Sequence, residues 1–102
     1  MSSAIVAEGR LVRDTITLVG TDGAAWLQVA LGLDSSNVIV ARQRVGQGYA
    51  AQYVSRNKAQ HLKRGQRVRV YAASITVELD EVRLHGVERI EELDLPVMEV
   101  AT

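Results

Sequence analysis

Residues 42–71 concentrate the side chains that could do chemistry in this chain. They hold eight lysines and arginines, three tyrosines and no acidic residue, although the whole chain of 102 residues has a formal net charge of zero. Cationic side chains bind phosphates, and flat rings stack on nucleobases. The composition of this segment therefore favours a partner that carries both groups, such as a single-stranded nucleic acid.

The segments on either side carry the opposite charge. Residues 1–41 contain two cations and four acids, and residues 72–102 contain two cations and eight acids, so the net charges along the chain are −2, +8 and −6. A segregation of this kind often marks a surface that meets a partner of opposite charge. The alternative is that the basic and acidic segments pair with one another within the fold.

The clearest strand is predicted at residues 66–73. Valine and alanine occupy every second position there, and the positions between them hold Arg67, Arg69 and Tyr71. Side chains alternate between the two faces of a strand. If the apolar residues fill a core, the two guanidinium groups and the phenol ring face outward onto an open groove.

Trp26 is the second predicted stacking position. It is opposite in phase to Leu27, Val29 and Leu31. If those three residues fill the core, the indole faces outward beside Gln28 and is available to a base. The alternative is a tryptophan that caps the core or is buried at a subunit interface.

The segment at residues 46–63 fits two structures. We expect a hairpin arm up to about residue 54, followed by a short helix over 57–63 that ends at Gly65, where a C-cap glycine belongs. The alternative is a helix from residue 49 onward, in which Tyr53 anchors the core. As an arm, the segment would present a basic and aromatic finger made of Arg42, Arg44, Tyr49, Tyr53, Arg56 and Lys58.

Short alternating runs separated by turns predict an all-β domain over residues 1–95, with a short tail at 96–102. The Asp22-Gly23 dipeptide marks a hairpin turn, and residues 34–37 mark a second turn. Five strands with one short helix between the third and the fourth predict a closed barrel, because closure removes exposed sheet edges. This is the element order of an OB-fold.

Four segments resemble the bacterial single-stranded DNA-binding protein family and its smaller relative, primosomal replication protein N. They are GRLVRD at 9–14, TDG at 21–23 followed by LQVA at 27–30, AQHLKRGQRVRV at 59–70, and LHGVERIEEL at 84–93. The resemblance implies an OB-fold that assembles as a homo-dimer or homo-tetramer and wraps single-stranded DNA in replication, recombination or repair. The lack of phenylalanine and the single tryptophan depart from that family's pattern and fit a divergent member, encoded by a mobile element or phage.

The expected function is therefore the binding of single-stranded DNA largely without sequence preference, with RNA as an open alternative. The chain has no phenylalanine and one tryptophan, and this scarcity keeps a second function open, that of an OB-fold protein-interaction subunit of a replication or secretion assembly. The residues expected to bind single-stranded DNA are Trp26, Arg42, Arg44, Tyr49, Tyr53, Lys58, Arg67, Arg69 and Tyr71.

Other functions find little support in the sequence. There is no cysteine, the two histidines have no partners at a spacing typical of a catalytic triad or metal site, and no lysine and hydroxyl pair follows Gly46 and Gly48 to make a phosphate loop. We therefore expect no enzymatic activity, no cofactor and no metal. The opening residues lack the layout of a secretion signal, and no apolar run is long enough for a membrane span, so we expect a cytoplasmic protein.

Overall fold

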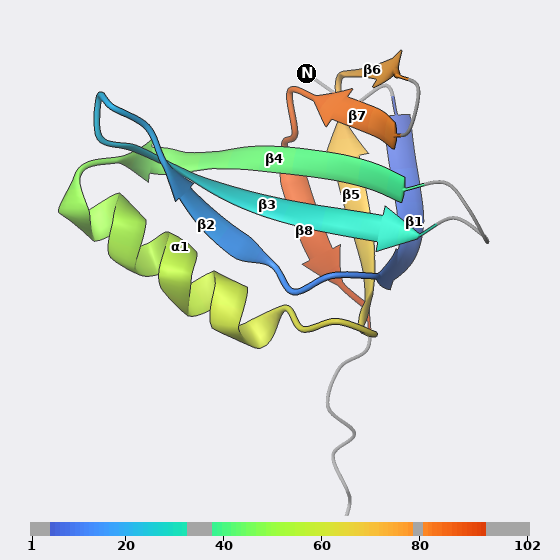
Figure 1. The fold of residues 1–102 in the computed structure, drawn as a ribbon, viewed down its shortest axis with the longest axis horizontal. Helices are drawn as coiled ribbons and strands as arrows, with labels where there is room; N and C mark the ends of the chain where they lie inside the picture. The colour runs from blue at the N-terminus through green and yellow to red at the C-terminus, as the bar shows by residue number, and fades with distance from the viewer. Residues whose placement is uncertain (1–4, 33–37, 79–80, 94–102) are drawn as a thin grey trace, which may run out of the picture.

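A computed structural model describes residues 5–32, 38–78 and 81–93 of the protein, and these residues form a curved sheet with one helix packed on one side of it (Figure 1). The all-β class predicted from the sequence is confirmed. The turn predicted at 34–37 and the tail at 96–102 lie outside the described residues. The elements in chain order are β1 (Ile5–Leu11), β2 (Ile16–Val19), β3 (Ala24–Gly32), β4 (Val38–Gln47), α1 (Tyr49–His61), β5 (Arg67–Ala72), β6 (Ser74–Val77), β7 (Glu81–His85) and β8 (Arg89–Glu92).

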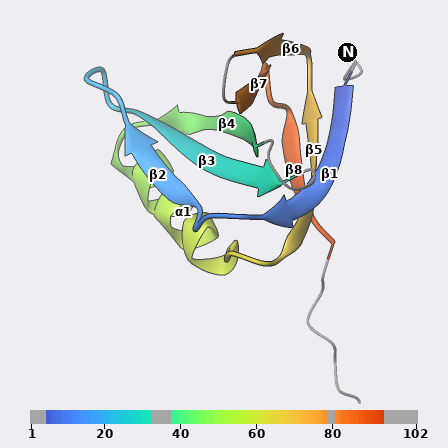
Figure 2. The ribbon, with the colours of Figure 1, turned by 45° about the vertical axis from the view of Figure 1, so that its right-hand side comes forward.

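The first two strands are consecutive in the chain but pair with different neighbours. β1 pairs antiparallel with β5 along its length and touches the end of β3, whereas β2 pairs antiparallel with β3. Figure 2 shows the chain passing from β1, beside β5, into β2, beside β3. Gly9 permits this crossing, because a Cβ atom there would lie 2.7 Å from the carbonyl oxygen of Gly32.

The expected closed five-stranded barrel is wrong, because the structure contains eight strands in an open sheet of order β6-β7-β4-β3-β1-β5-β8, with β2 paired to β3. The last strand of the sheet breaks at Gly86, which has a φ of +64°. Before the break β7 runs parallel to β4, and after it β8 runs antiparallel to β5. The β4–β7 ladder stops at Ala41 and Leu84. Beyond it, the Gln43 side chain donates a hydrogen bond to the carbonyl oxygen of Glu88 at 3.2 Å, which replaces backbone pairing between β4 and β8.

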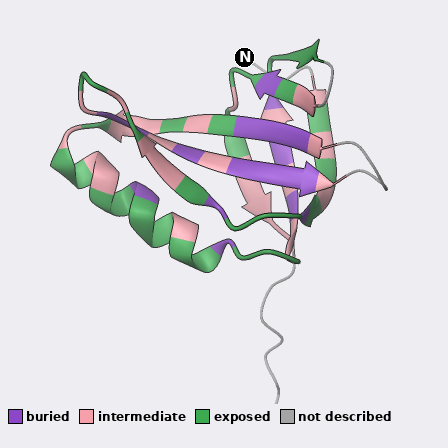
Figure 3. Cartoon of the chain, viewed as in Figure 1, coloured by how far each residue is buried: buried purple, intermediate pink, exposed green. Residues whose placement is uncertain are grey.

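The core lies on the concave side of the sheet and is filled by alternate residues of β3 and β5. Figure 3 shows buried positions along both strands. Val29, Leu31, Val68 and Val70 are fully buried, and Leu27 is almost so. The inward direction predicted for these residues is confirmed. Burial of such side chains is the main stabilising contribution to a domain of this size.

The helix differs from the prediction in extent. The hairpin arm expected through residue 54 is wrong, because α1 already begins at Tyr49 and ends at His61. Its start follows Gly48, whose φ of 91° is accessible to glycine at little cost. Gly65, expected as the C-cap, lies instead in the turn that leads to β5, where its amide donates to the carbonyl oxygen of Leu11 at 2.8 Å.

The buried face of α1 also differs from the prediction. Ser55 is completely buried. Its hydroxyl donates to the carbonyl oxygen of Trp26 at 3.1 Å and lies 3.0 Å from the hydroxyl of Thr17. Small residues on this face let the helix approach β2 and β3 closely, so that Tyr53 points into solvent instead of anchoring the core. No described helix is long and apolar enough to cross a membrane.

Candidate nucleic-acid interface

The convex face of β3 and β4 brings together one aromatic ring and two arginines. Trp26 lies opposite Arg44, and Gln28 lies opposite Arg42 in the antiparallel register of the two strands. Alternation places these side chains away from the core, because Leu27 between them is buried. The outward direction predicted for Trp26 is therefore confirmed, with the indole half-buried at the sheet surface.

Neutral amide groups hold both guanidinium groups on this face. Arg42 donates from Nε to the Gln28 side-chain oxygen at 2.7 Å, and Arg44 donates from Nη2 to the Gln47 side-chain oxygen at 3.1 Å. Neither arginine forms an ion pair with any described residue. Their positions are thus restrained while their charges are left without a counter-ion from the described part of the chain.

A groove of about 470 Å³ opens beside the indole, between β2 on one side and β7 on the other. Leu18 and Val40 supply apolar surface, and Arg83 and His85 supply polar groups. Arg83 is paired with Glu81 at 2.7 Å, and the His85 ring nitrogen Nε2 lies 2.8 Å from the hydroxyl of Thr76. None of these four groove residues is among those predicted from the sequence, although the alternation of Arg83 and His85 with the core residue Leu84 is a signal that could have identified these two.

The outward face of β5 has the predicted side chains but not the predicted open groove. The Glu8 carboxylate lies between the two arginines, with Oε2 at 2.6 Å from Arg67 and Oε1 at 3.0 Å from Arg69. Arg69 also pairs with Glu91 at 3.3 Å, and the Tyr71 hydroxyl donates to the same carboxylate at 3.0 Å. The expectation that these arginines face an open anion site is wrong, because carboxylates of β1 and β8 lie directly across from Arg69 in the sheet.

This network changes the acidity of Glu8. Hydrogen bonds from Arg69 and then from Arg67 stabilise the ionised carboxylate and lower the pKa of Glu8 below its ordinary value. The same face of β5 also contains a cation–π contact, because the Arg89 guanidinium lies 4.3 Å from the centre of the Tyr71 ring. The phenol ring expected to stack on a base is therefore already covered on one side by a cation of the protein.

The helix carries the remaining predicted residues on a separate surface. Tyr49 is 89% exposed and Tyr53 is 72% exposed, and they lie one turn apart on α1. Lys58 is also exposed and lines a different cavity, between α1 and β8. Because α1 packs against the concave side of the sheet through Ser55, these residues do not share a face with Trp26.

The structure thus divides the nine predicted residues among three surfaces. The convex sheet face unites Trp26, Arg42 and Arg44. The internal pairing of basic and acidic segments is found for the arginines of β5, whereas those of β4 form no ion pair with a described residue. Among residues 5–32, 38–78 and 81–93, no group of three or more potential ligands could hold a metal ion.

Comparison with known proteins adds no assignment to this geometry. The chain matches no model of a known protein family and no curated protein sequence. The function must therefore be argued from the residues of the convex face and from their surroundings.

Proposed function

We propose that the protein binds single-stranded DNA, largely without sequence preference, along the convex face of β3 and β4. The observation that carries the proposal is the union of Trp26, Arg42 and Arg44 on one face, where amides rather than carboxylates hold the arginines. Guanidinium groups neutralise phosphates, and an indole stacks on any of the bases. RNA offers the same phosphates and rings, so it is the alternative ligand of this face.

The finer fold assignment belongs to the same proposal. We infer that the eight described strands are the five strands of an OB-fold, with the first broken into β1 and β2, the fourth into β5 and β6, and the last into β7 and β8. Two features support this: the parallel pairing of β4 with β7 and the position of α1 before β5. In that numbering β3 and β4 are the second and third strands, whose face binds oligonucleotides in OB-folds.

One subunit offers few contacts, so useful affinity requires more than one copy of the chain. A stacked base contributes about 1–3 kcal/mol, and each neutralised phosphate of a single strand adds about −0.7 to the slope of log K against log salt. We therefore propose a homo-dimer or homo-tetramer, in which one strand contacts several convex faces and gains affinity from multivalency.

An oligo-dT titration followed by tryptophan fluorescence tests the proposal, because Trp26 is the only tryptophan of the chain. At about 50 mM salt we expect quenching on binding, and we expect affinity to fall as salt is raised. A duplex of the same length should bind less tightly, since its bases are not free to stack. No retardation of oligo-dT, or equal binding of duplex, would contradict the proposal.

A second function, docking of a protein partner within a replication or secretion assembly, is favoured by the helix. Two exposed tyrosines, Tyr49 and Tyr53, lie one turn apart on α1, away from the convex face. Exposed aromatic residues are enriched where proteins meet. If docking is the function, the fluorescence of Trp26 will not respond to oligo-dT, and replacement of both tyrosines by alanine will release a stably co-purifying chain.

A further inference from the structure

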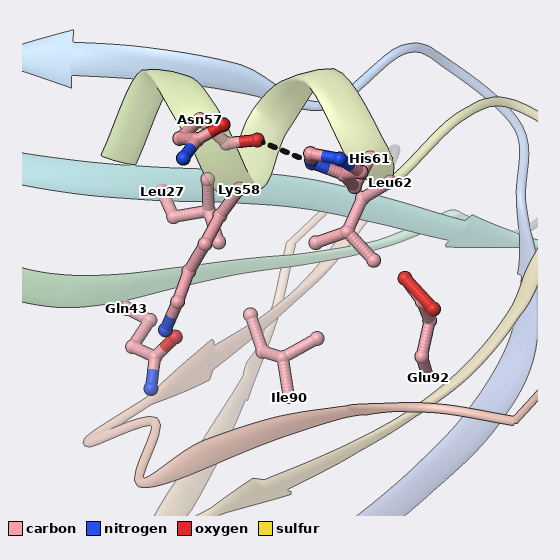
Figure 4. A pocket seen from close by; sticks show the side chains of 8 residues that line it. All are labelled: Leu27, Gln43, Asn57, Lys58, His61, Leu62, Ile90 and Glu92. Atoms are coloured by element: carbon pink, nitrogen blue, oxygen red, sulfur yellow. Dashed lines mark hydrogen bonds between the residues drawn. The ribbon is translucent and has the colours of Figure 1, made fainter. Parts of the chain in front are cut away.

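A second cavity of about 290 Å³ lies between α1 and β8, on the opposite face of β3 and β4 from the arginines (Figure 4). Its apolar walls are Leu27, Leu62 and Ile90, of which the first two are buried. Figure 4 shows Lys58 and Glu92 on opposite sides of this cavity, with the two aliphatic side chains of Leu62 and Ile90 between them. Its size is at the lower end of the range for small-molecule sites.

The cavity occupies the gap where the sheet fails to close. Gln43 lines it from β4 and is tied to β8 through its bond to the Glu88 carbonyl oxygen. This bond links β4 to the start of β8 beside the cavity. Among the described residues, neither Lys58 nor Glu92 forms an ion pair, and both charges are therefore open to a ligand.

The polar groups of the cavity select a ligand with donors at one end and an anion at the other. Glu92 is an acceptor when ionised. Nδ1 of His61 lies 2.8 Å from the carbonyl oxygen of Asn57, and because a carbonyl only accepts, Nδ1 donates to it. Lys58 supplies the opposing ammonium group.

We propose that this cavity binds a guanine nucleotide. Guanine presents two adjacent N–H donors, which suit a carboxylate that accepts two parallel hydrogen bonds from Glu92. The flat purine fits between Leu62 and Ile90, and the phosphate meets Lys58. Adenine and cytosine present one amino group beside an acceptor, and thymine presents one N–H between two carbonyl oxygens, so each leaves a lone pair facing the carboxylate.

The inference goes beyond the proposed function and does not depend on it, because the cavity and the convex face lie on opposite sides of β3 and β4. The guanine could belong to a free nucleotide or to a single strand, and the recognition chemistry is the same. Binding of oligo-dT, which lacks guanine, reports only on Trp26. Failure of either site is therefore distinguishable from failure of the other.

The experiment is a titration of the ¹⁵N-labelled protein with deoxyguanosine monophosphate, followed by amide chemical shifts. We expect shifts at Leu62, Ile90 and Glu92. Deoxyinosine monophosphate lacks only the exocyclic amine, so it should bind about tenfold more weakly or worse, as should thymidine monophosphate. Equal binding of the three nucleotides overturns the proposal.

Two variants separate the contacts. Glu92→Gln should weaken binding of deoxyguanosine monophosphate by about tenfold and should abolish its advantage over the inosine analogue. Lys58→Ala should weaken binding of the nucleotide but leave binding of the nucleoside deoxyguanosine unaffected. Lys63→Ala, in the exposed turn after α1, should change the binding of neither ligand. Unaltered guanine preference in Glu92→Gln contradicts the assignment.

A single guanine placed within oligo-dT distinguishes the two sources of the ligand. Cavity shifts with deoxyguanosine monophosphate alone assign a free nucleotide, and shifts only with the guanine-bearing oligonucleotide assign a strand. Both outcomes support a guanine site. Absence of guanine-dependent shifts in both arms overturns it.

Discussion

The two outward faces of the sheet carry similar residues and differ in what neutralises them. On β4, Arg42 and Arg44 are held by glutamine side chains. On β5, Arg67 and Arg69 are held by carboxylates of β1 and β8. The comparison teaches that alternation along one strand decides where an arginine points, whereas the neighbouring strands decide whether its charge is available to a partner.

The largest effect is expected from charge reversal on the convex face. Arg42→Glu combined with Arg44→Glu removes two phosphate contacts and adds repulsion, so affinity for oligo-dT at about 50 mM salt should fall by more than about 100-fold. The matched control, Lys63→Glu with Arg64→Glu, makes the same change in net charge at an exposed turn and should cost about tenfold or less. Equal losses in the two proteins would remove the distinction between local contact and overall charge.

Loss of the indole should have the next largest effect. Trp26→Ala removes one base–indole stack, which contributes about 1–3 kcal/mol, so the affinity for oligo-dT should fall by about tenfold in a retardation assay. Trp26→Phe keeps a ring and should recover most of the affinity. If both substitutions leave binding unchanged, the indole does not contact bases.

The face of β5 should respond far less. Arg67→Ala with Arg69→Ala removes cations that Glu8 and Glu91 already neutralise, so oligo-dT affinity should change by less than about threefold, and the salt slope should be almost unchanged. A slope of log K against log salt that is flatter by about 1.4, as expected for two lost phosphate contacts, would show that nucleic acid displaces the carboxylates. The outward face of β5 would then be part of the interface.

The smallest effect concerns pH. Because the pKa of Glu8 is lowered by its bonds to Arg69 and Arg67, its contribution to stability is present above the ordinary glutamate value of 4.5 and is lost as the pH falls below that value through the pKa of the folded state. Glu8→Gln should therefore have a lower urea midpoint near neutral pH, and its midpoint should fall less on acidification than that of the unsubstituted protein. Parallel midpoint curves for the two proteins would mean that the ion pairs of β5 do not contribute to stability.

Strand positions and side-chain directions could be predicted from the sequence, because the two-residue repeat at Val68 and Val70 and the Asp22-Gly23 turn are local signals. The counter-ions of β5 could not, since Glu8 lies 59 residues before Arg67. The buried face of α1 could not be predicted from apolar spacing, because its fully buried residue is a serine, Ser55. The break at Gly86 was missed because a single glycine in an alternating run does not reveal that its two sides pair with different strands.

The division of the last strand bears on how the chain reaches its native state. β7 lies near one end of the hydrogen-bonded order and β8 at the other, yet only residues 86–88 separate them. The sheet can therefore be completed at both ends only after its C-terminal residues are available, and its β1–β5 pairing joins segments far apart in sequence. Such non-local pairing slows folding, so during synthesis on the ribosome the protein has to wait for nearly the whole described chain before its apolar core is covered.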